Sequence, residues 1–255
     1  MLISTIILIM LGFAVGAFGT LVGIGGGIIL IPVFLLIMNY SQQHTIGTSL
    51  AVVFFNSLSG TLAYFRQRKI YFDAGIRFSL ATIPGALAGS FLAGYFTDKT
   101  FGITFGILLL VIAVSILIRS RKKQTEPQTF DPKEFVYNKP LGIILSFFVG
   151  FLSSILGIGG GVIHVPLLIF ALGFPTHIAT ATSHFVLAIS SFTGVASHLY
   201  LGNILPEPAL AIGFGAVLGA QFGARLSLKL NSRPIQIMLA LAMFSLGVRL
   251  LWANH

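Results

Sequence analysis

Long apolar segments, separated by short polar ones, follow one another through the whole of this 255-residue chain. About 20 consecutive apolar residues in a helix cross the hydrocarbon core of a bilayer. These segments are too long and too unbroken to be strands of a membrane β-barrel. The pattern predicts an all-α membrane protein, a polytopic helical bundle, with spans at residues 2–21, 46–65, 73–97, 100–118, 140–156, 178–200, 208–230 and 234–252.

Two shorter apolar pieces, residues 28–38 and 162–172, each follow a run of glycines. Helices of this length rise about 17 Å, which is about half the hydrocarbon core. Each piece belongs to one copy of a motif, GIGGGIILIP at residues 23–32 and GIGGGVIHVP at residues 157–166. Seven of the ten positions are identical, and the copies are 134 residues apart.

The same offset of 134 residues pairs Ser57 with Ser191 and Gly60 with Gly194. Self-similarity at a fixed offset indicates an internal duplication. Between the copies lies the one hydrophilic segment, which we expect to be a loose cytoplasmic linker. The predicted domains are a first transmembrane repeat at residues 1–118, the linker at 119–139 and a second transmembrane repeat at 140–255.

Composition agrees with the membrane class. Mean hydropathy is +0.98 and only 8% of residues are charged, against about 25% in soluble domains. The net charge of +9 comes from Lys and Arg between the spans, where they set topology, so nucleic acid is not expected as a partner. No cysteine is present, which excludes disulfides and thiolate chemistry. The first 20 residues lack a basic leader, so we expect a retained span rather than a signal peptide.

The basic residues favour one of two arrangements of the repeats. If each glycine-broken region crosses the bilayer once, the chain has eight full spans, the repeats are parallel, and 11 of the 15 Lys and Arg lie inside. If each region forms a hairpin, there are six spans plus two hairpins, the repeats are inverted, and 13 lie inside. The positive-inside rule favours the second arrangement. We predict an inverted repeat with glycine-broken hairpins and both termini outside.

The glycine motifs are suited to an anion site. Glycine lets the backbone turn sharply and approach a ligand closely. A helix that begins directly afterwards presents unpaired N–H groups and the positive end of its dipole, which together bind anions. In inverted-repeat transporters, such half-helices meet near the midplane and hold the substrate. The alternative is that the glycines only allow close helix packing. The predicted substrate-binding glycines are Gly25, Gly26, Gly27, Gly159, Gly160 and Gly161.

Hydroxyl and amide side chains extend the candidate site. We expect Thr48, Ser49, Thr182 and Ser183 at the start of the helix that follows each hairpin. Their hydroxyls could bind an oxyanion or cap the helix, and the sequence leaves both open. Asn56 falls within a span, where an amide is costly in lipid. We therefore expect it to face the protein interior, where it contacts substrate or joins helices.

Three histidines break the symmetry of the repeats, because the first repeat has Leu or Tyr at the matching positions. Intramembrane ionisable residues are functional candidates, and a histidine near an anion could couple transport to protons. The alternative is a neutral imidazole that packs between helices. Their spacing does not indicate a metal site. These histidines are His164, His184 and His198, of which we assign His164 and His184 to the substrate site.

No pattern supports an enzyme. The six acidic residues form no pair within the membrane, and no nucleophile elbow, zinc motif or P-loop is present. No cofactor is expected. Asp73 and Arg77 are one helical turn apart and are expected to pair with each other.

Two such glycine motifs, one in each half of a polytopic chain with a charged central linker, resemble the TauE/SafE family of membrane transporters, the sulfite exporter family. The resemblance covers essentially the whole chain. It implies a transporter of small sulfur-containing oxyanions such as sulfite or organosulfonates, in the bacterial inner membrane. Export is the expected direction, because an inside-negative potential drives an anion outward. The implied partners are a small anionic substrate and the lipid bilayer.

Other possibilities stay open at this point. The chain could be an anion channel, or a non-transporting membrane subunit of another complex. A homodimer is also open, because small residues such as Gly85 and Gly94 could pack helices within one protomer or between two.

Overall fold

The computed structural model describes residues 2–95, 98–120, 132, 134–229 and 232–253, and the regular structure in these residues is entirely helical. The all-α prediction is therefore confirmed. The helices are α1 (Leu2–Val22), α2 (Gly27–Pro32), the π-helical η1 (Val33–Ile37), α3 (Gln42–Arg66), α4 (Phe72–Ala93), α5 (Asp98–Ser120), α6 (Lys139–Leu156), α7 (Gly161–Phe170), α8 (Thr176–Tyr200), α9 (Pro206–Ser227) and α10 (Ser232–Ala253).

The helix after the first hairpin begins earlier than the hydrophobic pattern indicates. Ser41 caps α3, because its hydroxyl accepts a hydrogen bond from the backbone N–H of His44 at 3.4 Å. The cap extends α3 to Gln42, into polar residues that precede the span predicted at 46–65. Thr48 and Ser49 therefore lie more than a turn inside α3, and the prediction that they start the helix is wrong. The equivalent pair in α8 also lies inside its helix, which begins at Thr176.

Helices of the two repeats pack against each other along their length. α1 lies along α9, and α4 lies along α6. Small residues permit this approach, as is usual for helices in membranes. A Cβ added to Gly85 would meet the carbonyl oxygen of Phe147, and one added to Gly219 would meet that of Phe13. Gly85 thus packs helices within one chain, whereas a Cβ on Gly94 would meet nothing within 4 Å.

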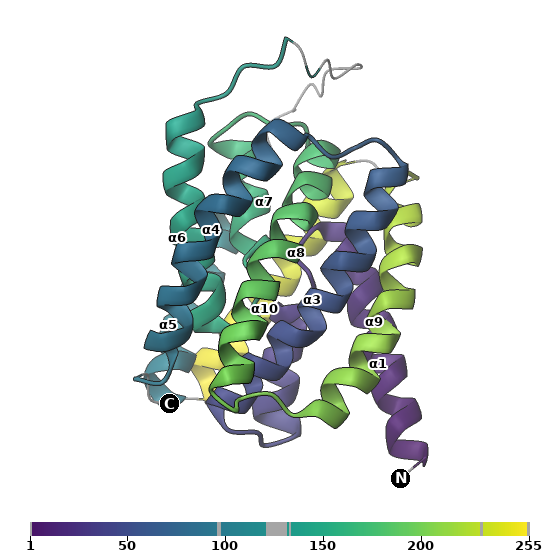
Figure 1. Cartoon of the computed structure of the whole chain (residues 1–255), viewed down its shortest axis with the longest axis vertical. Helices are drawn as coiled ribbons and strands as arrows, with labels where there is room; N and C mark the ends of the chain where they lie inside the picture. Colours follow the sequence, from purple (N-terminus) through teal and green to yellow (C-terminus); the bar gives the residue numbers. More distant parts are fainter. Residues whose placement is uncertain (1, 96–97, 121–131, 133, 230–231, 254–255) are drawn as a thin grey trace.

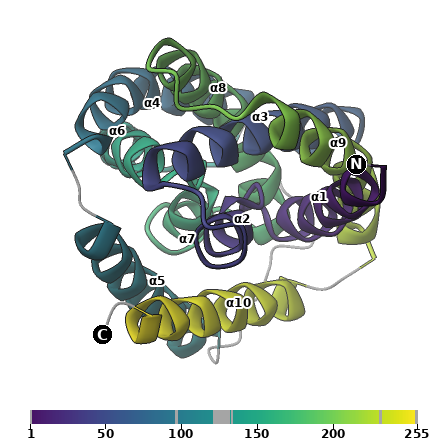
Figure 2. The ribbon, with the colours of Figure 1, turned by 90° about the horizontal axis from the view of Figure 1, so that it is seen from below.

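Helices α3 and α8 cross at the centre of the bundle, where the hydroxyls of Ser57 and Ser191 lie 3.4 Å apart. These two serines are equivalent in the repeats, so equivalent positions of the two repeats meet at this crossing. Figure 2 shows α2 and α7 beside this centre, with α5 and α10 forming a separate layer along one side.

The two repeats enter the bundle from opposite ends. Figure 1 places both chain termini at its lower end and residues 134–138, the described end of the segment between the repeats, at its upper end. α1 begins at the lower end, whereas its equivalent α6 begins at the upper end (Figure 1). The ends of α3 and α9 and the starts of α4 and α6 also lie at the upper end. These segments and the turns after them carry Arg66, Arg68, Lys69, Arg77, Lys139, Arg225 and Lys229.

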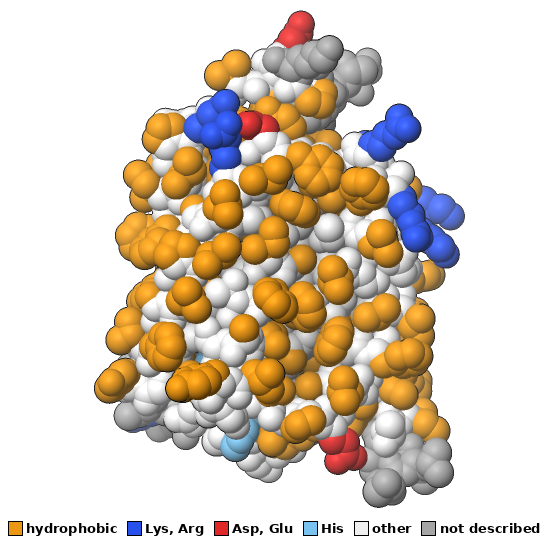
Figure 3. All heavy atoms as spheres, viewed as in Figure 1, with side chains coloured by type: hydrophobic (Ala, Val, Ile, Leu, Met, Phe, Trp, Pro, Cys, Tyr) orange, Lys and Arg blue, Asp and Glu red, His pale blue; other side chains and the backbone are white. Residues whose placement is uncertain are grey.

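The outer surface is apolar over most of its height. In Figure 3, hydrophobic side chains cover the middle of the visible face, and blue basic side chains gather near its upper end. Large apolar side chains such as Ile7, Leu80 and Phe148 are more than half exposed. In the part of the chain that the structure describes, six helices are long and apolar enough to cross a membrane, namely α1, α3, α4, α6, α8 and α9. Helices of this length and composition cross a bilayer, so the chain is a multi-pass membrane protein.

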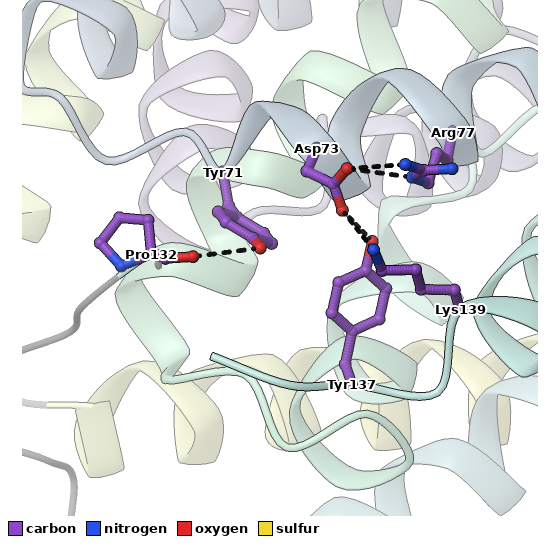
Figure 4. A network of polar contacts seen from close by, with 6 residues as sticks. All are labelled: Tyr71, Asp73, Arg77, Pro132, Tyr137 and Lys139. Atoms are coloured by element: carbon purple, nitrogen blue, oxygen red, sulfur yellow. Dashed lines mark hydrogen bonds and ion pairs between the residues drawn. The ribbon is translucent and has the colours of Figure 1, made fainter. Parts of the chain in front are cut away.

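The end of the linker that the structure describes is packed, which corrects the expectation of a loose segment there. Tyr137 donates a hydrogen bond to Asp73 at 2.8 Å, and Lys139 lies 3.7 Å from the same carboxylate (Figure 4). Burial, together with the hydrogen bond to Asp73, raises the pKa of the Tyr137 hydroxyl, so it remains a donor. Phe135 packs edge-on against Phe174 at 4.7 Å between ring centroids. The middle of the linker lies outside the described residues.

Candidate functional site

The two glycine motifs reverse the chain inside the bundle. Gly26 and Gly160 precede the first residues of α2 and α7 and adopt the left-handed conformation, with φ of 85° and 79°. A side chain in this conformation costs about 1–2 kcal/mol, so glycine is strongly favoured at both positions. The carbonyl of Gly19 closes the first turn by accepting the N–H groups of Gly23 and Gly25 at 2.9 and 3.3 Å. The N–H of Gly25 is thus partly used by a carbonyl of α1.

The motifs meet backbone to backbone at the centre of the protein. A Cβ built on Gly27 would lie 2.8 Å from the Cα of Ile158, and one on Gly161 would lie 2.8 Å from the Cα of Ile24. The residues of both motif turns are buried. Only a residue without a side chain allows the two backbones to approach this closely, which explains the glycines at positions 27 and 161.

Helices α2 and α7 both begin at this contact, as Figure 2 shows. The N–H groups of a helix's first turn have no carbonyl partner within that helix. Here the carbonyl of Gly160 already accepts the N–H groups of Ile163 and His164. The N–H groups of Gly161 and Val162 have no acceptor in this turn of α7. In α2, Gly27 and Ile28 occupy the equivalent positions. The positive ends of two helices therefore point into one buried region.

Ser49 and Ser183 tie each repeat to the opposite motif. Ser49 donates its hydroxyl hydrogen bond to the carbonyl of Gly157 at 2.8 Å, and Ser183 donates to that of Gly23 at 3.5 Å. Both serines are fully buried. They lie at the motifs, as the sequence predicts, but each hydroxyl proton is used on backbone.

Thr48 and Thr182 lie one residue away and serve a different structure. Thr182 accepts the backbone N–H of Tyr71 at 3.0 Å, and Thr48 accepts that of Leu205 at 3.1 Å. Tyr71 and Leu205 directly precede α4 and α9. The threonines therefore hold the entry of a helix in the opposite repeat, rather than capping their own helix.

Asn56 is fully buried, which confirms that it faces the protein interior. Its Oδ1 accepts the hydroxyl hydrogen bond of Thr20 at 2.9 Å, and its Nδ2 makes no hydrogen bond within the described structure. His184 reaches the same hydroxyl, with Nε2 3.3 Å from Thr20 Oγ1. Tyr64 completes the cluster by donating to the carbonyl of Thr20 at 2.8 Å. The structure thus brings Asn56 and His184 together through Thr20, which the sequence analysis missed.

The other two histidines are buried in different places. His164 lies in the first turn of α7, and its Nε2 is 3.3 Å from the hydroxyl of Ser146 on α6. Its ring stands edge-on to Phe78 at 5.7 Å. His198 lies near the end of α8 with Nδ1 3.2 Å from the amide nitrogen of Asn203. Neither is joined to Asn56 by a described hydrogen bond.

The centre of the bundle offers neutral hydrogen-bond donors and no ion. No Lys, Arg, Asp or Glu is buried among the residues whose exposure the structure describes. No group of three or more His, Asp or Glu side chains that could hold a metal occurs in the described part either. Backbone N–H groups, hydroxyls and one amide can all bind an anion.

Comparison with known proteins assigns the family. A model of the family "Sulfite exporter TauE/SafE" matches residues 8–250. The chain is 32% identical to "Probable membrane transporter protein YunE" of Bacillus subtilis, over 98% of both chains. It is 28% identical to "Probable membrane transporter protein MJ0441" of Methanocaldococcus jannaschii, over 96% of this chain and 94% of that one. No solved structure matches significantly. The chain belongs to the sulfite exporter TauE/SafE family and is a membrane transporter.

Proposed function

We propose that this transporter moves small sulfur-containing oxyanions, such as sulfite or organosulfonates, out of the cell. The observation that carries the proposal is the buried contact between the two motifs, where α2 and α7 both begin. In the proposal, N–H groups around Gly25–Gly27 and Gly159–Gly161 hold the anion. The hydroxyls of the Thr-Ser pairs, the free amide hydrogens of Asn56, and His164 and His184 complete its surroundings.

The family name and the chemistry of the centre support an anionic substrate. The name of the matching family refers to sulfite export. The region around the motifs contains donors and lacks carboxylates in the described residues, so it suits an acceptor-rich anion better than a cation. Donors without a full charge hold an anion loosely enough to release it on the other side.

An inverted repeat accounts for movement across the membrane. Opposite directions of α1 and α6, and basic residues at the end of the molecule that carries the linker, support this arrangement. The two repeats then rock, or a glycine-broken hairpin moves, and the site opens to each side of the membrane in turn. An inside-negative potential drives an anion outward by about 2.3 kcal/mol per charge per 100 mV, so export needs no coupled ion.

Flux of radiolabelled sulfite into proteoliposomes tests the proposal, with imposed potentials of both signs. Unlabelled taurine, sulfoacetate, sulfate and thiosulfate serve as competitors, and protein-free liposomes give the background. We expect saturable flux that follows the potential and is inhibited by a subset of the competitors. Flux at the background level for every anion would contradict the proposal.

The same experiment separates the remaining alternatives. A channel would give flux that does not saturate and is not accelerated by unlabelled sulfite on the opposite side. A non-transporting subunit would give no flux alone and would copurify with a stoichiometric partner. We propose neither an enzymatic activity nor a cofactor.

A further inference from the structure

Three buried serines near the second motif are unlike the other buried serines of the protein. Most buried helical serines donate to their own helix, as Ser79 does to Gly75 and Ser90 does to Ala86, at 2.7 and 2.9 Å. A buried hydroxyl with no partner is destabilising, so such groups need an explanation. The serines whose hydroxyls make no hydrogen bond within the described structure are Ser153, Ser154 and Ser190, which are 0%, 0% and 2% exposed.

Ser153 lies at the point where α7 begins. A Cβ built on Gly160 would be 3.3 Å from its hydroxyl oxygen, and Gly160 directly precedes the 10-residue helix α7. The hydroxyl therefore lies against the residue that directly precedes the first turn of α7. Ser154 packs against α8, where a Cβ on Gly194 would be 3.1 Å from its hydroxyl. Ser190 is one turn from Gly194 on the same helix.

The first repeat carries different residues at the three equivalent positions. The residue that corresponds to Ser153 is Gly19, which has no hydroxyl. The residues that correspond to Ser154 and Ser190 are Thr20 and Asn56. The Thr20 hydroxyl donates a hydrogen bond to Asn56 Oδ1 at 2.9 Å. Serine is shorter than asparagine, so the same bond is not made in the second repeat. The first repeat thus pairs Thr20 with the Oδ1 atom of Asn56, whereas Ser154 and Ser190 have no partner within the described structure.

We propose that the second motif is the stronger half of the anion site, and that Ser153 and Ser154 determine its affinity for a small oxyanion. This inference rests on the proposed function and assigns the ligand's position within it. An oxyanion offers several acceptor oxygens, which match two hydroxyls and the first-turn N–H groups of α7. The positive end of α7 favours an anion over a cation at this point. Ser190 contributes a third hydroxyl from α8.

The variants Ser153→Ala and Ser154→Ala test the assignment, with Ser90→Ala as the matched control. Each is measured for the half-saturating sulfite concentration in proteoliposomes, and for the melting temperature of purified protein with and without sulfite. A hydrogen bond to a charged group is worth a factor of about ten or more in affinity. We expect the half-saturating concentration to rise about tenfold in both variants, and sulfite to raise their melting temperature less than that of the unmodified protein.

Stability without sulfite separates a binding role from a structural one. Removal of an unpaired buried hydroxyl leaves the melting temperature unchanged or higher, whereas Ser90→Ala removes a made hydrogen bond and lowers it. Two results would overturn the inference, provided that the unmodified protein transports sulfite. One is an unchanged sulfite affinity in both Ser153→Ala and Ser154→Ala. The other is a fall in their melting temperatures like that of Ser90→Ala. Absence of both flux and sulfite stabilisation in the unmodified protein would instead refute the proposed function itself.

Discussion

Two serine hydroxyls each hold a carbonyl of the opposite motif, at unequal distances. Ser49 lies 2.8 Å from the carbonyl of Gly157, and Ser183 lies 3.5 Å from that of Gly23. We predict that Ser49→Ala lowers the free energy of unfolding by about 1–3 kcal/mol, because a buried carbonyl loses its partner. Ser183→Ala should cost less, since its bond is longer. Thermal unfolding resolves the difference at about 2–4 °C per kcal/mol for a chain of this size. Equal shifts would contradict the geometry.

Asn56 combines a used acceptor with an unused donor. Its Oδ1 accepts from Thr20, and its Nδ2 is free in the described structure. We predict that Asn56→Ala raises the half-saturating sulfite concentration several-fold and also lowers the melting temperature, because Thr20 loses its acceptor. Ser115→Ala on α5 is the control, since that hydroxyl bonds its own helix at 2.7 Å. A variant that melts lower but transports with unchanged affinity would give Asn56 a purely structural role.

The contacts and burial of individual residues could be predicted from the sequence only where neighbouring residues or the lipid environment determine them. The pairing of Asp73 with Arg77 follows from one helical turn of separation and is confirmed at 2.9 Å. The burial of Asn56 follows from the cost of an amide in lipid. The partners of Thr48 and Thr182 could not be predicted, because each is a backbone N–H more than 100 residues away. Ser153 and Ser154 carry a weak signal, two adjacent hydroxyls directly before a motif, which only the packing makes meaningful.

At the scale of helices, the hydrophobic pattern gives most boundaries to within a few residues. The short pieces predicted at 28–38 and 162–172 correspond to α2 with η1 and to α7. The pattern fails at the start of α3, where Ser41 extends the helix into polar residues. It also fails for the linker, because Phe135 and Tyr137 pack on aromatic neighbours contributed by other segments.

The packed end of the linker rests on aromatic contacts more than on its ion pairs. Asp73 and Arg77 are a third or more exposed, and exposed pairs contribute little. We predict that Tyr137→Ala accelerates chymotryptic cleavage after Phe135, whereas Asp73→Asn has a much smaller effect. Fragment analysis by mass spectrometry measures both rates. Equal acceleration by the two variants would show that the ion pairs hold the segment.

For the whole molecule, duplication in the sequence shows that two equivalent halves exist but not how they join. Either first helix could pack within its own repeat or on the other repeat, and the repeated pattern would be the same. The structure shows the exchanged pairing, with α1 along α9 and α4 along α6. Because the helices interlock in this way, we expect neither repeat to form the site alone.

The inverted arrangement makes a prediction about sidedness that the absence of cysteine allows to be tested cleanly. Leu228 and Tyr200 are 55% and 85% exposed, after α9 and at the end of α8. We predict that Leu228→Cys reacts with an impermeant thiol reagent only after the cytoplasmic side is opened. Tyr200→Cys should react in intact cells. Labelling of Leu228→Cys from outside would refute the arrangement.

The central claim is that an oxyanion binds where the two motifs meet, and its position can be measured directly. Selenite has the shape and charge of sulfite, and selenium scatters anomalously. A crystal structure of the protein with selenite should show one strong anomalous peak within hydrogen-bonding distance of the backbone around Gly160 and Gly161. A peak only elsewhere, with selenite shown to compete for sulfite flux, would contradict the site.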